Sequence, residues 1–277
     1  MKWLQFILSH SIFIAFCAAA LAFQTVQLLQ VHADIFLYGF IFFSTLCSYN
    51  FYWLVSLYFF RGHASGIHVF LRKELGKIIL FSLSGTGLVI CFFYSSLTIN
   101  NIIPALLLTV IYAIPLLPFK FTQFVRKAGV LKTVLLAFTW SYVTAYLPLQ
   151  KSFLLLNNAD LFIISRRFLF MLMLCIIFDS RDMSVDKIRG LRSLATDLGP
   201  KTLRFFIGVI FLVLFATNFL SLNYGISINQ SIALQVSTLA LLIAWYFSTK
   251  KQGYFFYYFF IDGLMLFSAL TTYIASI

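Results

Sequence analysis

The chain has 277 residues, of which 62% are hydrophobic and only 10% are charged, and its mean hydropathy is +0.97. A soluble domain of this length cannot bury so much apolar surface, so a soluble globular fold is excluded and lipid is the expected solvent. The formal net charge of +12 would suit a nucleic-acid partner, but the placement of the basic residues along the chain explains it as a membrane signal.

Nine apolar stretches follow one another along the chain, and each is long enough to predict a membrane-spanning helix. The stretches are continuous rather than alternating, which disfavours a β-barrel. Together they predict an all-α, polytopic membrane bundle that forms a single domain over residues 1–277. The spans are expected near residues 3–22, 34–59, 78–97, 101–118, 132–149, 162–179, 203–221, 230–248 and 254–275.

The first stretch has a second interpretation. Its basic start, apolar middle and small residues also fit a cleaved signal peptide. Cleavage would leave eight spans, and the remaining spans would keep the same orientation, so the charge pattern is compatible with both interpretations.

The basic residues indicate the orientation. With these spans, all but three of the 20 Lys and Arg residues lie on one side of the membrane, the exceptions being Lys151, Arg166 and Arg167. The two arginines begin the sixth span and are expected to reach outward to the interface. The positive-inside rule then assigns the basic side and the N-terminus to the cytoplasm, as in a protein of the bacterial inner membrane, and no nucleic-acid partner is expected.

Several common sites have no sequence signature here. The four cysteines lie far apart in apolar segments, and no CxxC, GxxxxGK[ST] or GxGxxG motif occurs. A zinc site, an iron–sulfur cluster and a nucleotide-binding loop are therefore disfavoured.

Acidic residues gather in one loop after the sixth span. Asp179, Asp182, Asp186 and Asp197 are four of the eight acidic residues in the chain. On a helix, the DxxDxxxD spacing of the first three places them within an arc of roughly 60°. Like charges this close are destabilising unless a cation lies among them.

Two interpretations of this acidic face remain open. Carboxylates that bind Mg²⁺ together with a phosphate substrate would remove the repulsion, and neighbouring bases such as Lys187 and Arg192 could bind the other phosphate oxygens. Alternatively, the helix is a solvated segment at the membrane surface whose acids pair with its own bases, such as Asp186 with Arg189.

The longer pattern DxxDxxxDxxxGxxSLAxxLG, residues 179–199, resembles the second aspartate motif of the UbiA superfamily of intramembrane prenyltransferases. Residues 111–132 resemble the end of that family's fourth span, where a tyrosine, a Pro-Leu pair and a basic cluster precede a glycine. The resemblance implies about nine transmembrane helices around a central cavity. It also implies transfer of a prenyl group from a prenyl diphosphate to an aromatic or other lipophilic acceptor.

The resemblance also assigns the site. It implies that Asp179, Asp182 and Asp186 are catalytic and bind Mg²⁺. The residues expected to bind the substrate are Asn50, Arg61, Tyr112, Lys120, Arg126, Lys187 and Arg192.

The family's first motif, NDxxDxxxD, is present only as its asparagine. Aligned on Asn50, its aspartates fall at Phe51, Leu54 and Tyr58. The missing carboxylates leave a second hypothesis open, a catalytically silent relative that binds a lipid or a partner.

A transporter is the third hypothesis, and the sequence gives it little support. The spans carry almost no acids and the chain shows no internal repeat. Asp262 in the ninth span is the exception: it is expected either to be satisfied within the bundle or to pair with a base that lines the cavity.

Overall fold

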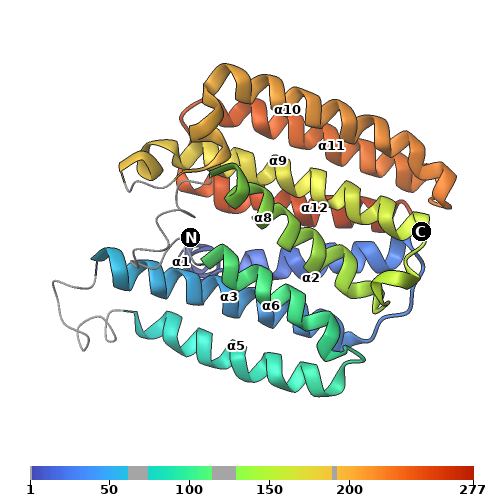
Figure 1. Cartoon of the computed structure of the whole chain (residues 1–277), viewed down its shortest axis with the longest axis horizontal. Helices are drawn as coiled ribbons and strands as arrows, with labels where there is room; N and C mark the ends of the chain where they lie inside the picture. Colours follow the sequence, from blue (N-terminus) through green and yellow to red (C-terminus); the bar gives the residue numbers. More distant parts are fainter. Residues whose placement is uncertain (1, 62–73, 114–128, 189–191) are drawn as a thin grey trace.

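The computed structural model of the chain describes residues 2–61, 74–113, 129–188 and 192–277 (Figure 1). All regular secondary structure in these ranges is helical. The elements are α1 (Lys2–Ser9), α2 (Ile12–Leu28), α3 (Ile35–Arg61), α5 (Leu75–Tyr94), α6 (Ile99–Ala113), α8 (Gly129–Ser141), η3 (Tyr142–Tyr146), η4 (Leu147–Leu149), η5 (Phe153–Leu155), α9 (Asn158–Ile188), α10 (Leu194–Leu220), η6 (Ser221–Tyr224), α11 (Ile228–Ser248), η7 (Phe256–Ile261) and α12 (Asp262–Ile274).

Seven helices in the described ranges are long and apolar enough to cross a membrane. They are α3, α5, α8 with its continuation, α9, α10 with its continuation, α11, and η7 with α12. Two further expected spans correspond to the pair α1 and α2, bent by 68°, and to the shorter apolar helix α6. The bend falls at Ser11, whose left-handed backbone (φ 62°) cannot continue a right-handed helix. The prediction of an all-α polytopic membrane bundle is confirmed.

The outer surface of the bundle is apolar, as lipid requires. On α5, Ile79, Leu83, Val89, Ile90 and Phe93 are each at least half exposed, and Phe93 is 77% exposed. A largely apolar helix face of this extent would be unstable in water. It supports the assignment of the chain as an integral membrane protein.

The helices run roughly side by side, so the connections between them gather at two ends (Figure 1). At one end, α3 and α9 finish while α5, α8 and α10 begin, and the N-terminus lies toward this end. We call it the motif end, because it holds Asp179 and Asp182. The C-terminus lies at the opposite end.

Two buried arginines connect α9 to its neighbours. Arg167 donates from Nη2 to the Leu21 carbonyl at 3.1 Å and to Gln24 Oε1 at 2.8 Å, and Arg166 donates from Nε to Asn218 Oδ1 at 2.6 Å. Both residues are almost fully buried: Arg166 is 3% exposed and Arg167 is 2% exposed. The expectation that they reach outward to the interface is wrong, because polar groups on α2 and α10 accept their hydrogen bonds inside the bundle.

Asp34 lies between α2 and α3, at the end opposite the motif end, and takes part in a hydrogen-bond network with the connections that follow α5 and η4. Its carboxylate accepts hydrogen bonds from the Leu37 amide at 2.7 Å and the Ser96 hydroxyl at 2.8 Å, and the same hydroxyl lies 2.6 Å from Gln150 Oε1. Burial alone would raise the pKa of the Asp34 carboxyl, but the hydrogen bonds from Ser96 and Leu37 outweigh it and lower the pKa below its ordinary value.

Candidate functional site

The helix that carries the aspartates is continuous. α9 extends over 31 residues to Ile188, so Asp179 and Asp182 lie near its end, as the DxxDxxxD spacing predicted. Asp186 and Lys187 also lie on this helix, but their side chains are outside the described part of the structure. Of the three aspartates in the predicted acidic face, the structure therefore describes the side chains of Asp179 and Asp182.

Asp179 meets α8 and the start of α10 through one hydroxyl group. Thr133 on α8 donates a hydrogen bond to Asp179 Oδ2, and the same Thr133 oxygen accepts the Leu194 amide at 3.1 Å. Thr133 is only 2% exposed. The first aspartate of the motif and its Ser-Leu-Ala segment, separated along the chain, thus contact the same residue.

The start of α10 is shaped by the rest of the motif. The Ser193 amide donates to Thr196 Oγ1 at 2.8 Å, which closes the first turn of the helix. Gly199 then interrupts α10 with a backbone (φ 72°, ψ 168°) that only glycine adopts readily, and Pro200 begins the helix again. The short helical segment 194–198 is therefore set at an angle that the Gly-Pro pair fixes.

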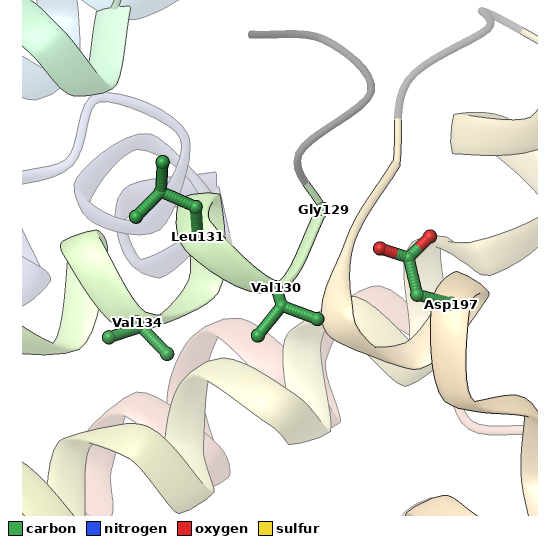
Figure 2. A pocket seen from close by; sticks show the side chains of 5 residues that line it. All are labelled: Gly129, Val130, Leu131, Val134 and Asp197. Atoms are coloured by element: carbon green, nitrogen blue, oxygen red, sulfur yellow. The ribbon is translucent and has the colours of Figure 1, made fainter.

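A close approach of two helix starts forms the neighbouring pocket. A Cβ atom added at Gly129, the first residue of α8, would lie 2.6 Å from Asp197 Oδ2 and 2.6 Å from the Ser193 amide nitrogen. Figure 2 shows the Asp197 carboxylate beside this helix start, where the dipole of α8 favours a negative charge. The pocket has a volume of about 470 Å³ and is lined by Gly129, Val130, Leu131, Val134 and Asp197.

Asp182 has a different partner. Its two oxygens accept hydrogen bonds from Nε and Nη2 of Arg181, both at 2.7 Å. The Arg181 guanidinium also lies 5.0 Å from the ring centres of Phe178, Tyr257 and Tyr258. The ion pair and the aromatic contacts hold Arg181 between α9 and η7.

Aromatic side chains from several helices pack against one another inside the bundle. Tyr112 of α6 stacks on Tyr52 of α3 at 5.6 Å, and Tyr49 of α3 meets Trp140 of α8 edge to face at 6.2 Å. Tyr112 is the second-last residue of α6, which ends toward the motif end. Tyr112 was predicted to bind substrate, and this placement is compatible with that role.

The Asn50 side chain is buried and hydrogen-bonded to the backbone. Its side-chain amide donates to the Leu46 carbonyl at 2.8 Å and to the His10 carbonyl at 3.2 Å, and the residue is 1% exposed. Its Oδ1 atom is buried without a hydrogen-bond partner. The Asn50 amide nitrogen thus connects α3 to the residue that follows α1, while the Asn50 Oδ1 atom accepts no hydrogen bond.

The other predicted substrate-binding bases are less well defined. Arg192 is exposed and lies 4.0 Å from Asp197. Arg61 ends α3 with its side chain outside the described part, and Lys120 and Arg126 lie outside the described residues altogether. Their roles stay predictions.

The donor set can be compared with the needs of Mg²⁺. Carboxylate oxygens are the ligands that Mg²⁺ prefers, and Asp179 and Asp182 supply two such groups near the end of one helix. Over the described ranges, no group of three His, Cys, Asp or Glu side chains lies close enough to hold a metal. The chemistry of the pair fits Mg²⁺, with Asp186 as the third ligand that the motif predicts.

Sequence reasoning missed three features of this end. Thr133, Arg181 and the Tyr257–Tyr258 pair were not predicted as site residues, although Arg181 stands inside the DxxD spacing. The aromatic run before Asp262 was the available signal for the pair. Nothing in the local sequence marks Thr133, because its partners come from other helices.

No protein-family model matches the chain, and no curated protein matches it. Among solved structures, the apo structure of a UbiA homolog from Aeropyrum pernix K1 superposes with a TM-score of 0.59 at 11% identity, covering 96% of this chain and 97% of that chain. The overlap extends over nearly the whole of both chains, and the chain therefore has the UbiA-like fold that its aspartate motif predicted.

Proposed function

We propose that this chain is an integral membrane prenyltransferase, which transfers a prenyl group from a prenyl diphosphate to an aromatic or other lipophilic acceptor. One observation carries the proposal: within a UbiA-like fold, Thr133 contacts both Asp179 and Leu194. The two halves of the motif that resembles a diphosphate-binding sequence are thereby brought together at one end of the bundle.

Mg²⁺ is the proposed cofactor, held by Asp179, Asp182 and Asp186. When bound, Mg²⁺ would neutralise charge on the leaving diphosphate. The carboxylate of Asp182 is paired with Arg181, so a metal ion that takes the same lone pairs would displace the guanidinium.

The residues of the chain would contribute in three ways. Thr133 orients Asp179 through its hydrogen bond. Aromatic side chains such as Tyr112 and Trp140 would exclude water from an allylic cation and stabilise it through their ring faces. The proposed contacts of the diphosphate oxygens are Asn50, Arg61, Lys120, Arg126, Lys187 and Arg192.

We assign the motif end to the cytoplasmic side of a bacterial inner membrane. The connections expected at this end carry most of the basic residues of the chain, which the positive-inside rule retains in the cytoplasm. A charged diphosphate formed in the cytoplasm would reach the site without crossing the bilayer.

Product formation tests the proposal. The purified protein is offered radiolabelled prenyl diphosphates of several lengths with Mg²⁺ and a lipid extract of the host. Wild type should give a labelled lipophilic product, and Asp179→Ala should give none. Asp160→Ala is the control, because Asp160 is buried beside Lys151 at the opposite end. Product from Asp179→Ala at the wild-type rate would contradict the proposed site.

A catalytically silent relative is the second candidate, and one observation favours it. The α3 positions where the first motif would supply aspartates hold Phe51, Leu54 and Tyr58. The same assay separates the two functions: a silent relative retains the labelled diphosphate on the protein and forms no product from any donor length.

A further inference from the structure

Arg181 is held by Asp182, which the proposed function needs as a metal ligand. The pairing uses both carboxylate oxygens at 2.7 Å, in the two-bond geometry that makes Arg–carboxylate pairs strong. A divalent ion that takes the carboxylate lone pairs now directed at Arg181 would leave the guanidinium without its partner. A cation without an anion is costly in this half-buried position, where the Arg181 side chain is 23% exposed.

Asp262 is a second carboxylate on the surface that Arg181 touches. The Arg181 guanidinium lies 5.0 Å from the ring centres of Tyr257 and Tyr258 in η7, and Asp262 follows directly as the first residue of α12. η7 is a π-helical turn, so residues four and five positions apart share one face. That spacing places Asp262 on the same face as both tyrosines, about one turn farther along the helix, or roughly 5 Å.

The Asp262 carboxylate has no fixed partner in the described part of the chain. The residue is 4% exposed, yet its side chain makes no hydrogen bond or ion pair with any described residue. A buried carboxylate is rarely left without a partner in a membrane-spanning segment, which points to a role that this arrangement does not display.

We propose that Asp262 is a positioning residue, the alternative partner that receives Arg181 when a divalent cation takes Asp182. This inference rests on the proposed function, because it assigns Asp182 to the metal. The exchange keeps Arg181 paired in both arrangements, and it moves its charge along the face formed by Tyr257, Tyr258 and Asp262. It also gives Asp262 the second role that the sequence left open, that of partner for a base inside the bundle.

The first test is the metal dependence of binding. Binding of a non-reactive prenyl thiodiphosphate is measured by calorimetry as a function of Mg²⁺ concentration. Asp262→Asn should weaken the apparent Mg²⁺ affinity about tenfold, because Arg181 then has no second carboxylate to accept it. Asp262→Glu should restore most of the affinity, and Asp160→Asn, which changes a buried aspartate at the opposite end, should match wild type. Equal Mg²⁺ affinities in wild type and Asp262→Asn would overturn the inference.

The second test needs neither metal nor substrate. The melting temperatures of wild type, Asp182→Asn, Asp262→Asn and the double variant are measured in detergent with EDTA. The double variant should lose more than the sum of the single losses, since only there does Arg181 lack both carboxylates. Additive losses would overturn the exchange even if Mg²⁺-dependent binding were found. Wild type that binds no diphosphate, together with non-additive losses, would contradict the proposed function and the metal-driven exchange, and it would leave only Asp262 as an alternative partner of Arg181.

Discussion

The hydroxyl group of Thr133 lies where three helices meet. It donates to Asp179 on α9 and accepts from the Leu194 amide at the start of α10, while Thr133 itself belongs to α8. A hydroxyl can donate and accept at once, and a carboxylate or an aliphatic side chain of similar size cannot. The position of Asp179 at the motif end thus depends on a residue that would bind neither substrate nor metal.

Thr133→Val tests this dependence with little change in shape. The substitution removes the donor to Asp179 and the acceptor of the Leu194 amide, and it should lower the free energy of unfolding by about 1–3 kcal/mol. Chemical denaturation in detergent measures the loss. Thr139→Val is the control, since Thr139 on the same helix donates to the Leu135 carbonyl of its own turn and has no other hydrogen bond among the described residues. Equal losses in both variants would show that the contact with Asp179 contributes nothing.

Gly129 permits the contact between the starts of α8 and α10. A methyl group there would lie 2.6 Å from Asp197 Oδ2 and 2.6 Å from the Ser193 amide nitrogen, so one of the helices must shift. Gly129→Ala should destabilise the protein by about 1–3 kcal/mol, as overpacking does. Gly208→Ala on α10 meets nothing within 4 Å and should be neutral or stabilising by up to about 1 kcal/mol. Thermal unfolding of the pair checks this, and a stable Gly129→Ala protein would argue against the close approach.

In α10, the motif residue Gly199 acts through its backbone conformation, which interrupts the helix. Gly199 separates the short segment that carries Leu194 from the long membrane-spanning part, and its φ of 72° and ψ of 168° lie in a region that side chains with a Cβ avoid. The backbone conformation therefore explains why the motif ends in a glycine, which the sequence pattern alone did not explain.

Gly199→Ala should strain this junction by about 1–3 kcal/mol and turn the short segment away from Thr133. The expected result is a lower melting temperature together with weaker diphosphate binding. Gly225→Asn is the comparison, because Gly225 has φ 80° and ψ 9°, a left-handed conformation that asparagine tolerates. A melting temperature of Gly199→Ala equal to that of Gly225→Asn would contradict this explanation.

For the whole molecule, apolar periodicity and charge were enough to predict the helical membrane fold, because lipid imposes length and composition on every span. The helix carrying Asp179 and Asp182 followed from spacing in the same way. The pairing of Asp182 with Arg181 did not, since neighbouring residues on a helix seldom face each other and the aromatic contacts come from a distant segment. The burial of Arg166 and Arg167 was likewise hidden, because their acceptors lie on other helices.

Orientation in the membrane is a property of the whole chain and can be measured directly. Leu154 between α8 and α9 is 93% exposed, and Lys251 is exposed between α11 and η7, at the other end. In intact cells a membrane-impermeant maleimide should label Leu154→Cys, whereas Lys251→Cys should react only after permeabilisation. Wild type, with its native cysteines, gives the background. The reverse pattern would place the motif end outside.

The central claim is that Asp179 and its neighbours at the motif end bind a prenyl diphosphate with Mg²⁺. The most direct measurement is equilibrium binding of a labelled prenyl diphosphate to the purified protein, with Mg²⁺ and with EDTA. Binding should require Mg²⁺ in wild type and in Asp160→Asn, and it should be lost in Asp179→Asn and in Asp182→Asn. Undiminished, Mg²⁺-dependent binding in both of the latter variants would contradict the account.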